Sequence, residues 1–171
     1  MKPSLPKVII SACLVGQRTR YDGRIVDDGI ARALSDRVNL VTVCPETAIG
    51  LPVPRPKIRL VTTTNGIRVL HSVTDADLTD SLTMYAREFL AQHRDAAGFV
   101  LKAKSPSCGM GDCRLYPNAA AEESTGFDTG VFAQQARQLF PEALFVNEND
   151  LEAPGSIDRF FADVSGQANS R

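Results

Sequence analysis

Three short apolar runs constrain this chain more than any other feature, because each is closely followed by a cysteine. Apolar runs of this length are typical of strands buried on both faces of a parallel sheet. Parallel strands bring their carboxyl ends to one edge of the sheet, where open α/β sheets bind their ligands. The runs and their cysteines are residues 8–11 with Cys13, residues 40–43 with Cys44, and residues 99–102 with Cys108.

These cysteines are therefore expected to converge on one point, although they lie far apart in the sequence. Three thiolates with no evident fourth ligand suit an iron–sulfur cluster with one open iron, or a catalytic metal with an open position. Buried cysteines can also be ordinary small apolar residues, an alternative that the loop position of these three weakens. A zinc site is a further alternative, and the lack of Cys-x-x-Cys spacing counts against it.

Composition and charge narrow the class of protein. The chain has 171 residues, 43% of them hydrophobic and 23% charged, and a net charge of -1, which fits one soluble domain spanning residues 1–171. Such a charge gives no electrostatic reason to expect binding to nucleic acid or to a membrane. The first residues lack the apolar core of a secretion signal, and no segment approaches the roughly 18 apolar residues of a membrane span, so we expect a cytoplasmic location. In that compartment cysteines indicate metal binding or catalysis rather than disulfides.

Strand-like runs alternate with helix-like periodicity along the chain. This alternation predicts an α/β fold, with a mainly parallel, Rossmann-like open sheet flanked by helices in a single domain. Asn65 and Gly66, between two apolar runs, predict a small β-hairpin at the edge of the fold. Residues 148–171 are expected to add a helix and a tail to a core of residues 8–147. The expected strands are 8–11, 40–43, 58–61, 67–70, 99–102 and 143–146, and the expected helices are 27–37, about 74–93, 130–139 and 154–164.

Five short motifs are spread along the chain. They are Ser-Ala-Cys-Leu-Val-Gly at 11–16, Arg-Tyr-Asp-Gly at 20–23, Cys-Pro-Glu at 44–46, Gly-Leu-Pro-Val-Pro-Arg-Pro at 50–56 and Lys-Ser-Pro-Ser-Cys-Gly at 104–109. Together they resemble a bacterial family long catalogued as a domain of unknown function, some of whose members are [4Fe-4S]-dependent thiouracil desulfidases. The resemblance covers residues 8–147 and is specific because the motifs occur in the family's order.

The resemblance implies a [4Fe-4S] cluster held by Cys13, Cys44 and Cys108. It also implies a non-redox desulfuration of a thiolated pyrimidine such as 2-thiouracil, giving uracil and hydrogen sulfide, with the substrate sulfur bound at the open cluster iron. A soft thiocarbonyl sulfur prefers such a soft metal centre. The expected partner is therefore a small thiolated heterocycle. Relatives commonly carry Ser in place of Ala103 and a different segment after Gly109, which bears on the substrate more than on the cluster.

Desulfuration by water also needs an acid/base group. Glu46, two residues after a predicted ligand, is the first candidate. Its alternative role is to accept free backbone N–H groups at the start of a helix. Ser105 is the second candidate, for hydrogen bonding or proton relay near the substrate, and its alternative is a turn residue before Pro106.

Further residues are expected in the surroundings of the cluster and the substrate. Ser11 and Ser107 could orient the cluster or donate to its sulfurs, and Gly109 would let the backbone pass close to it. Asp22 could bind substrate, although the turn at residues 21–23 is the favoured explanation for it. Ordinary solvated loop charges, rather than a site for an anionic substrate, are expected at Arg18, Arg20, Arg55 and Lys57.

Cys113 follows Cys108 by five positions and is expected to be a loop thiol that does not bind the cluster. Its alternatives are a fourth ligand, a resolving thiol or a sulfur carrier. Two other functions remain open. One is a metal-free thiol or sulfur-transfer enzyme with Cys108 as the nucleophile, and the other is a non-catalytic cluster-binding module in which Cys113 is a ligand.

Overall fold

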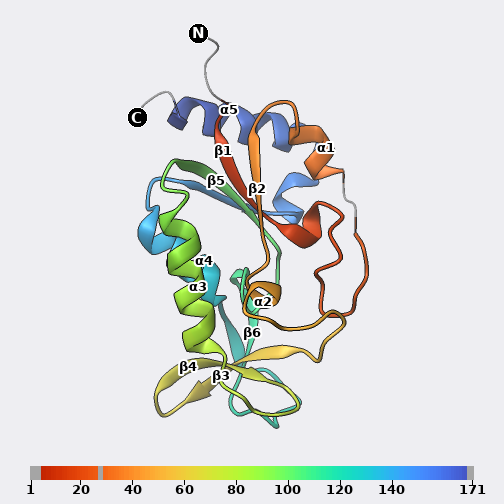
Figure 1. Cartoon of the computed structure of the whole chain (residues 1–171), viewed down its shortest axis with the longest axis vertical. Coiled ribbons are helices and arrows are strands. Elements are labelled where there is room, and N and C mark those ends of the chain that lie inside the picture. The colour runs from red at the N-terminus through yellow and green to blue at the C-terminus, as the bar shows by residue number, and fades with distance from the viewer. Residues whose placement is uncertain (1–4, 27–28, 169–171) are drawn as a thin grey trace.

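The computed structural model describes residues 5–26 and 29–168, and within them the chain forms two four-stranded sheets (Figure 1). The strands are β1 Lys7–Ser11, β2 Asn39–Val43, β3 Ile58–Thr63, β4 Gly66–His71, β5 Ala96–Leu101, β6 Met110–Tyr116, β7 Gly126–Thr129 and β8 Leu144–Asn147. The α-helices are α1 Ile30–Leu34, α2 Pro45–Ala48, α3 Thr79–Ala91, α4 Val131–Leu139 and α5 Ser156–Ala168, with short 3-10 turns at Ala12–Leu14 and Asn149–Leu151.

The first sheet is parallel throughout and has the order β2-β1-β5-β8. Helices cover both of its faces, as the pleat of β1 shows. Ile9 packs into a core with residues of α3 and α4, whereas its neighbours Val8 and Ile10 pack with residues of α1 and α5. The fold class expected from the alternation of strands and helices, an α/β fold with a mainly parallel sheet, is therefore confirmed.

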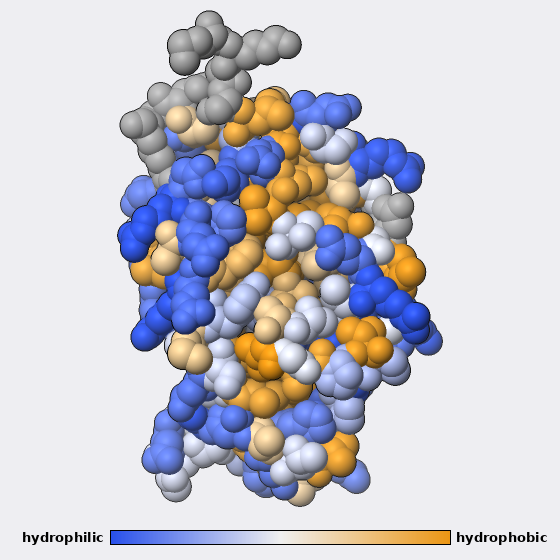
Figure 2. Space-filling view, in the orientation of Figure 1, coloured by the Kyte–Doolittle hydropathy of each residue, from blue (hydrophilic) through white to orange (hydrophobic). Residues whose placement is uncertain are grey.

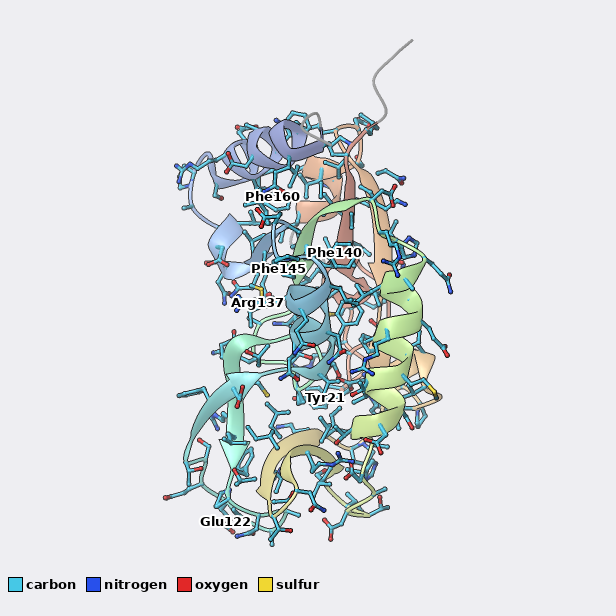
Figure 3. The ribbon with its side chains drawn as sticks, turned by 90° about the vertical axis from the view of Figure 1, so that its left-hand side faces the viewer. Tyr21, Glu122, Arg137, Phe140, Phe145 and Phe160 are labelled. Atoms are coloured by element: carbon cyan, nitrogen blue, oxygen red, sulfur yellow. The ribbon has the colours of Figure 1, made fainter. Side chains whose placement is uncertain are left out.

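Aromatic rings fill the core between this sheet and α4. Phe145 of β8 stacks on Phe99 of β5 with ring centroids 4.5 Å apart, and Phe140 meets Phe99 edge-on at 5.2 Å. Figure 3 shows Phe140 and Phe145 close together near α4, with Phe160 of α5 just above them. Phe160 belongs to the core on the other face of the sheet. The Arg137 guanidinium lies 5.7 Å from the Phe145 ring centroid and covers its outer side. This packing fixes β5 and β8, whose ends lead to the site.

The predicted hairpin is present as β3 and β4, at the lower end of the molecule in Figure 1. It belongs to a second, mixed sheet of order β4-β3-β6-β7, which the sequence pattern did not predict. β6 pairs with β3 in parallel and with β7 in antiparallel fashion. Strand β6 reads Met-Gly-Asp-Cys-Arg-Leu-Tyr and β7 reads Gly-Phe-Asp-Thr, and neither has the continuous apolar character of the predicted strands.

The boundaries of three helices differ from the prediction, and one of these helices, α5, runs from Ser156 to Ala168 rather than over 154–164. The helix expected from about residue 74 begins at Thr79, because residues 72–78 first turn back along β4 and form an isolated bridge between Leu70 and Asp77. Asp75, which has a φ of 55°, cannot be a helical residue. The helix expected over 27–37 is the shorter α1, and residues 27 and 28 of that prediction lie outside the described residues.

No helix in the part of the chain that is described is long and apolar enough to cross a membrane. Figure 2 shows hydrophobic residues gathered along the middle of one face, with hydrophilic residues on either side of them.

Candidate active site

A cavity of about 660 Å³ opens between the two sheets. Residues at the carboxyl ends of β1, β2 and β5 line one side of it, and residues of β3, β6 and β7 line the other. This is the edge at which parallel α/β sheets bind ligands. Asp22 and Gly109 lie outside its wall. The other predicted site residues all line it: Ser11, Cys13, Cys44, Glu46, Ser105, Ser107 and Cys108.

The three predicted ligands reach the cavity from three different strands. Cys13 lies in the 3-10 turn directly after β1, and Cys44 is the residue between β2 and α2. Cys108 lies in the loop between β5 and β6 and is 4% exposed. The parallel topology thus places three thiols, distant in sequence, on the wall of one cavity.

Burial favours the protonated form of Cys13 and Cys108. It raises the pKa of Cys13 to about 11 and the pKa of Cys108 far above its usual range. The negative charges of Cys13 and Cys44 raise the pKa of Cys108 further, so the three sulfurs lie within one another's electrostatic field. Lys102 lowers the pKa of Cys13, and a hydrogen bond from Ser11 lowers that of Cys108. Because metals bind thiolates, loading a metal here would release protons.

The donor set decides which kind of metal group these residues fit. Among the described residues, no group of three or more His, Cys, Asp or Glu side chains is spaced to hold a single metal ion. Three sulfur donors on one cavity wall are the donor type that an iron–sulfur cluster would take. Thr19 supports this fit, since its buried Oγ1 at the cavity wall has no hydrogen-bond partner among the described residues and could donate to a bound group.

Glu46 is the acidic residue beside the thiols, in the first turn of α2. Its carboxylate accepts hydrogen bonds from Nε of Arg55, 2.8 Å from Oε2, and from Oγ of Ser107, 3.2 Å from Oε1. Nη2 of Arg55 also lies 2.8 Å from Oε2 and completes the ion pair. Arg55 also donates to the carbonyl oxygens of Pro52 and Thr19. The described contacts hold Glu46 in one orientation at the cavity, and they are side-chain contacts rather than the backbone N–H contacts of a helix start.

Arg55 was expected to be a solvated loop charge, and this prediction is wrong. Arg55 is 7% exposed, and Glu46, its ion-pair partner, is 9% exposed. No periodicity connects Glu46 in α2 with Arg55 in the loop that follows, so the pairing depends on tertiary structure. One signal was nevertheless available, because a glutamate expected to be buried beside a cluster requires a cationic partner.

Ser105 organises the turn that carries Cys108. Its Oγ accepts hydrogen bonds from the backbone N–H groups of Ser107, at 3.2 Å, and Cys108, at 3.0 Å. The Ser105 carbonyl accepts a third bond from the N–H of Gly109 at 2.7 Å. Ser105 thus stabilises the turn and also lines the cavity. Its hydroxyl proton remains available for donation.

Two glycines let this turn pack against neighbouring backbone. A Cβ at Gly109 would lie 2.7 Å from the Ser105 carbonyl oxygen, which explains why only a glycine fits there although it does not line the cavity. A Cβ at Gly130, just before α4, would lie 2.5 Å from the carbonyl of Ser107. The N–H groups of Val131 and Phe132 donate to the carbonyls of Pro106 and Ser107. The start of α4 therefore holds residues 105–109 in place.

Ser11 and Asp22 have different roles in the structure. Ser11 Oγ accepts a hydrogen bond from the N–H of Lys102 at 2.9 Å, which connects the ends of β1 and β5 beneath the cavity. Asp22 accepts bonds from the Arg20 side chain and from the N–H of Arg24. These contacts, the Arg20 bond above all, lower the pKa of Asp22 to about 2. They fit the turn predicted at residues 21–23.

The chain is similar to known proteins over most of its length. Residues 8–149 match the 2-thiouracil desulfurase family. The chain belongs to this family. The predicted family is therefore confirmed, and the expectation of a thiouracil desulfidase-like enzyme that cleaves a carbon–sulfur bond is confirmed at the level of the family.

Two known proteins are similar to this chain over most of its length. An uncharacterized protein of Bacillus subtilis (strain 168), YbbK, is 31% identical over 153 residues, which cover 84% of this chain and 99% of the relative. The solved structure of TudS, a [4Fe-4S]-dependent thiouracil desulfidase, is 29% identical with a TM-score of 0.65, over 85% of this chain and 93% of TudS. The structural match extends the family relationship to the whole α/β frame.

Several wall residues of this desulfurase were not predicted from sequence. They come from the second sheet, whose strands β6 and β7 escaped detection. Cys113 is one of them. It is a buried residue of β6 rather than a loop thiol, and burial raises its pKa to about 12. The others on this side are Ile58, Arg59, Asp112, Arg114, Tyr116 and Phe127.

Proposed function

We propose that this protein catalyses the non-redox removal of sulfur from a thiolated pyrimidine such as 2-thiouracil, with a [4Fe-4S] cluster held by Cys13, Cys44 and Cys108. The observation that carries the proposal is the meeting of these thiols with Glu46 at one cavity, in a chain of the 2-thiouracil desulfurase family. The cavity of about 660 Å³ has room for a cluster and a single heterocycle.

When bound, the cluster would supply a soft Lewis-acidic iron, free of cysteine, for the thiocarbonyl sulfur. The overall reaction is balanced without electron transfer. The oxygen of one water molecule replaces sulfur on the ring carbon, and both of its protons leave with the sulfur as hydrogen sulfide. The protein must therefore move protons, and it needs no reductant.

Glu46 is the proposed acceptor of the proton from the attacking water. Arg55 fixes its Oε2, and Ser107 donates to Oε1, so the carboxylate keeps a constant position at the cavity wall. A general base placed in this way contributes typically 10²- to 10⁴-fold to a rate. Ser105 is the proposed donor to the heterocycle, because its oxygen already accepts two N–H bonds and its proton is free to point into the cavity.

The geometry disfavours a metal-free enzyme with Cys108 as the nucleophile. Cys108 is 4% exposed, and burial raises its pKa, so little of it would be thiolate near neutral pH. A non-catalytic cluster module with Cys113 as a fourth ligand remains the alternative that experiment has to separate from the desulfidase.

The test is anaerobic reconstitution with iron and sulfide, read by visible absorption and bound iron. We expect Cys13→Ala, Cys44→Ala and Cys108→Ala each to lose the cluster, and Cys113→Ala, the matched thiol control, to retain it. The loaded parent should release uracil and hydrogen sulfide from 2-thiouracil. A parent that binds no iron, or a cluster that depends on Cys113, would contradict the proposal.

Glu46→Gln separates catalysis from cluster binding. We expect it to retain bound iron while uracil formation falls by about 10²- to 10⁴-fold, the range typical of a lost general base. Glu122→Gln is the matched control, because Glu122 is exposed and lies at the bottom of the molecule in Figure 3. Full activity in Glu46→Gln would remove Glu46 from the mechanism.

A further inference from the structure

The fourth strand of the parallel sheet also delivers a chemical group to the cavity edge. β5 ends at Leu101 and β8 at Asn147, and these two residues are partners in the β5–β8 ladder. The residues that follow them, Lys102 and Glu148, therefore leave the sheet side by side. Lys102 lines the cavity, whereas Glu148 is buried behind it. The mechanism above uses neither of them.

Glu148 holds the Lys102 ammonium through a fixed set of contacts. Lys102 Nζ forms an ion pair with Glu148 Oε1 and donates to the carbonyl of Ala103 at 3.3 Å. Glu148 Oε2 accepts the backbone N–H of Ala103 at 2.8 Å, so both of its oxygens are engaged. A lysine on a flexible stem is in this way restrained at one place on the cavity wall.

Lys102 lies close to the turn that carries Cys13. Both residues line the cavity, and the backbone N–H of Lys102 donates to Oγ of Ser11, the last residue of β1, at 2.9 Å. Among the charged groups that act on the Cys13 thiol, Lys102 has the largest effect. Lys102 directly follows β5, whose neighbour β1 leads to Cys13, and three thiolates would make this edge strongly negative.

We propose that Lys102, held by Glu148, is a positioning residue of the cluster site, which offsets the negative charge of the three cysteine thiolates and their cluster. This inference rests on the proposed function, because it requires the cluster to bind. Lys102 acts on the cluster through space and through its restraint by Glu148, and it is not a ligand. It sets both the iron affinity of the site and the reduction potential of the cluster.

The experiment compares anaerobically reconstituted full-length variants by iron competition against a chelator and by redox titration followed in visible absorption. We expect Lys102→Met to bind iron about 10- to 100-fold more weakly, as is typical when a group beside a metal ligand is removed. Its midpoint potential should also become more negative. Lys102→Arg keeps the charge and should resemble the parent. Lys104→Met is the matched control, because Lys104 lines the same cavity but is exposed.

A second variant covers the case in which Lys102→Met fails to fold with Glu148 left buried and unpaired. The double variant Lys102→Met/Glu148→Gln removes both charges and retains an acceptor for the Ala103 N–H. We expect its potential to shift in the same direction as in Lys102→Met, by less. If the Lys102–Glu148 pair only joined β5 to β8, the midpoint potential of the double variant would equal that of the parent. This result would overturn the inference.

The outcomes also separate this inference from the proposed function. A parent that loads no iron would overturn both. A loaded parent with equal potentials and iron affinities in Lys102→Met and Lys104→Met would overturn the role of Lys102 alone and leave the three-cysteine site intact.

Discussion

Arg55 and Glu46 form a buried ion pair at the cavity wall, and each depends on the other for its place in the interior. We expect Arg55→Met to lower the free energy of unfolding by about 3–5 kcal/mol, because it leaves a buried carboxylate without a partner. Glu46→Gln/Arg55→Met should recover part of this loss, since no buried charge remains. Urea denaturation of the apo proteins measures both.

The matched control for that prediction is Arg68→Met. Arg68 pairs with Asp77 at 2.7 Å, but both side chains are considerably exposed, so about 1 kcal/mol or less should be lost. Equal losses in Arg55→Met and Arg68→Met would show that the Glu46 site is open to water and does not require its partner.

At the scale of single residues, prediction succeeded where a residue type is tied to a strand end. Cys13, Cys44 and Cys108 each follow an apolar run, and the parallel topology then fixes where they meet. Arg55 could not be located in this way. It lies in the loop between α2 and β3, and its role arises from pairing with Glu46, which no local pattern encodes.

At the scale of elements, the turn of residues 104–109 and the start of α4 act as one unit. We expect Gly130→Ala to lower the free energy of unfolding by about 1–3 kcal/mol, because the new methyl group would lie 2.5 Å from the Ser107 carbonyl. The displaced turn carries Cys108, so bound iron after reconstitution should fall as well. Melting curves and iron content provide the two readouts.

Gly126→Ala is the control for this substitution, since a Cβ at Gly126 meets nothing within 4 Å. It should change neither stability nor iron content appreciably. Parent-like iron content in Gly130→Ala would indicate that α4 moves instead of the turn and would refute the coupling between them.

The strands and helices that could be predicted from the sequence are those with extensive burial. β1 and β5 are almost wholly buried and read as continuous apolar runs, and α4 has a clear apolar face, so all three were found. β6 has only one fully buried residue, Cys113, and its polar neighbours conceal it. The start of α3 was misplaced because residues 72–78 turn back and pair with β4, a local contact that helix periodicity does not contain.

At the scale of the whole molecule, the fold rests on apolar cores that form on both faces of the parallel sheet without help from a cluster. We therefore expect removal of iron by a chelator to leave the far-UV circular dichroism unchanged and the thermal transition cooperative, while activity is lost. Cys13→Ala, which should never load a cluster, is the reference for this state. Loss of helical signal on chelation would contradict a fold that is independent of its cofactor.

The α/β class and its parallel sheet were predictable at this scale, because strand and helix patterns alternate along most of the chain. The pairing of the hairpin with β6 and β7 was not predictable. The position of the cavity between the two sheets could therefore not be predicted either. A pairing such as Leu60 with Leu115 connects segments separated in the sequence by β4, α3 and β5, and only the folded molecule shows it.

The two walls of the cavity carry different parts of the site. The parallel sheet supplies the thiols and Glu46, whereas the mixed sheet presents side chains such as Tyr116 and the 65% exposed Phe127. Substitutions on the second wall can accumulate without disturbing the first. A scaffold divided in this manner can acquire new substrates by drift on one side while its inherited reaction is preserved on the other.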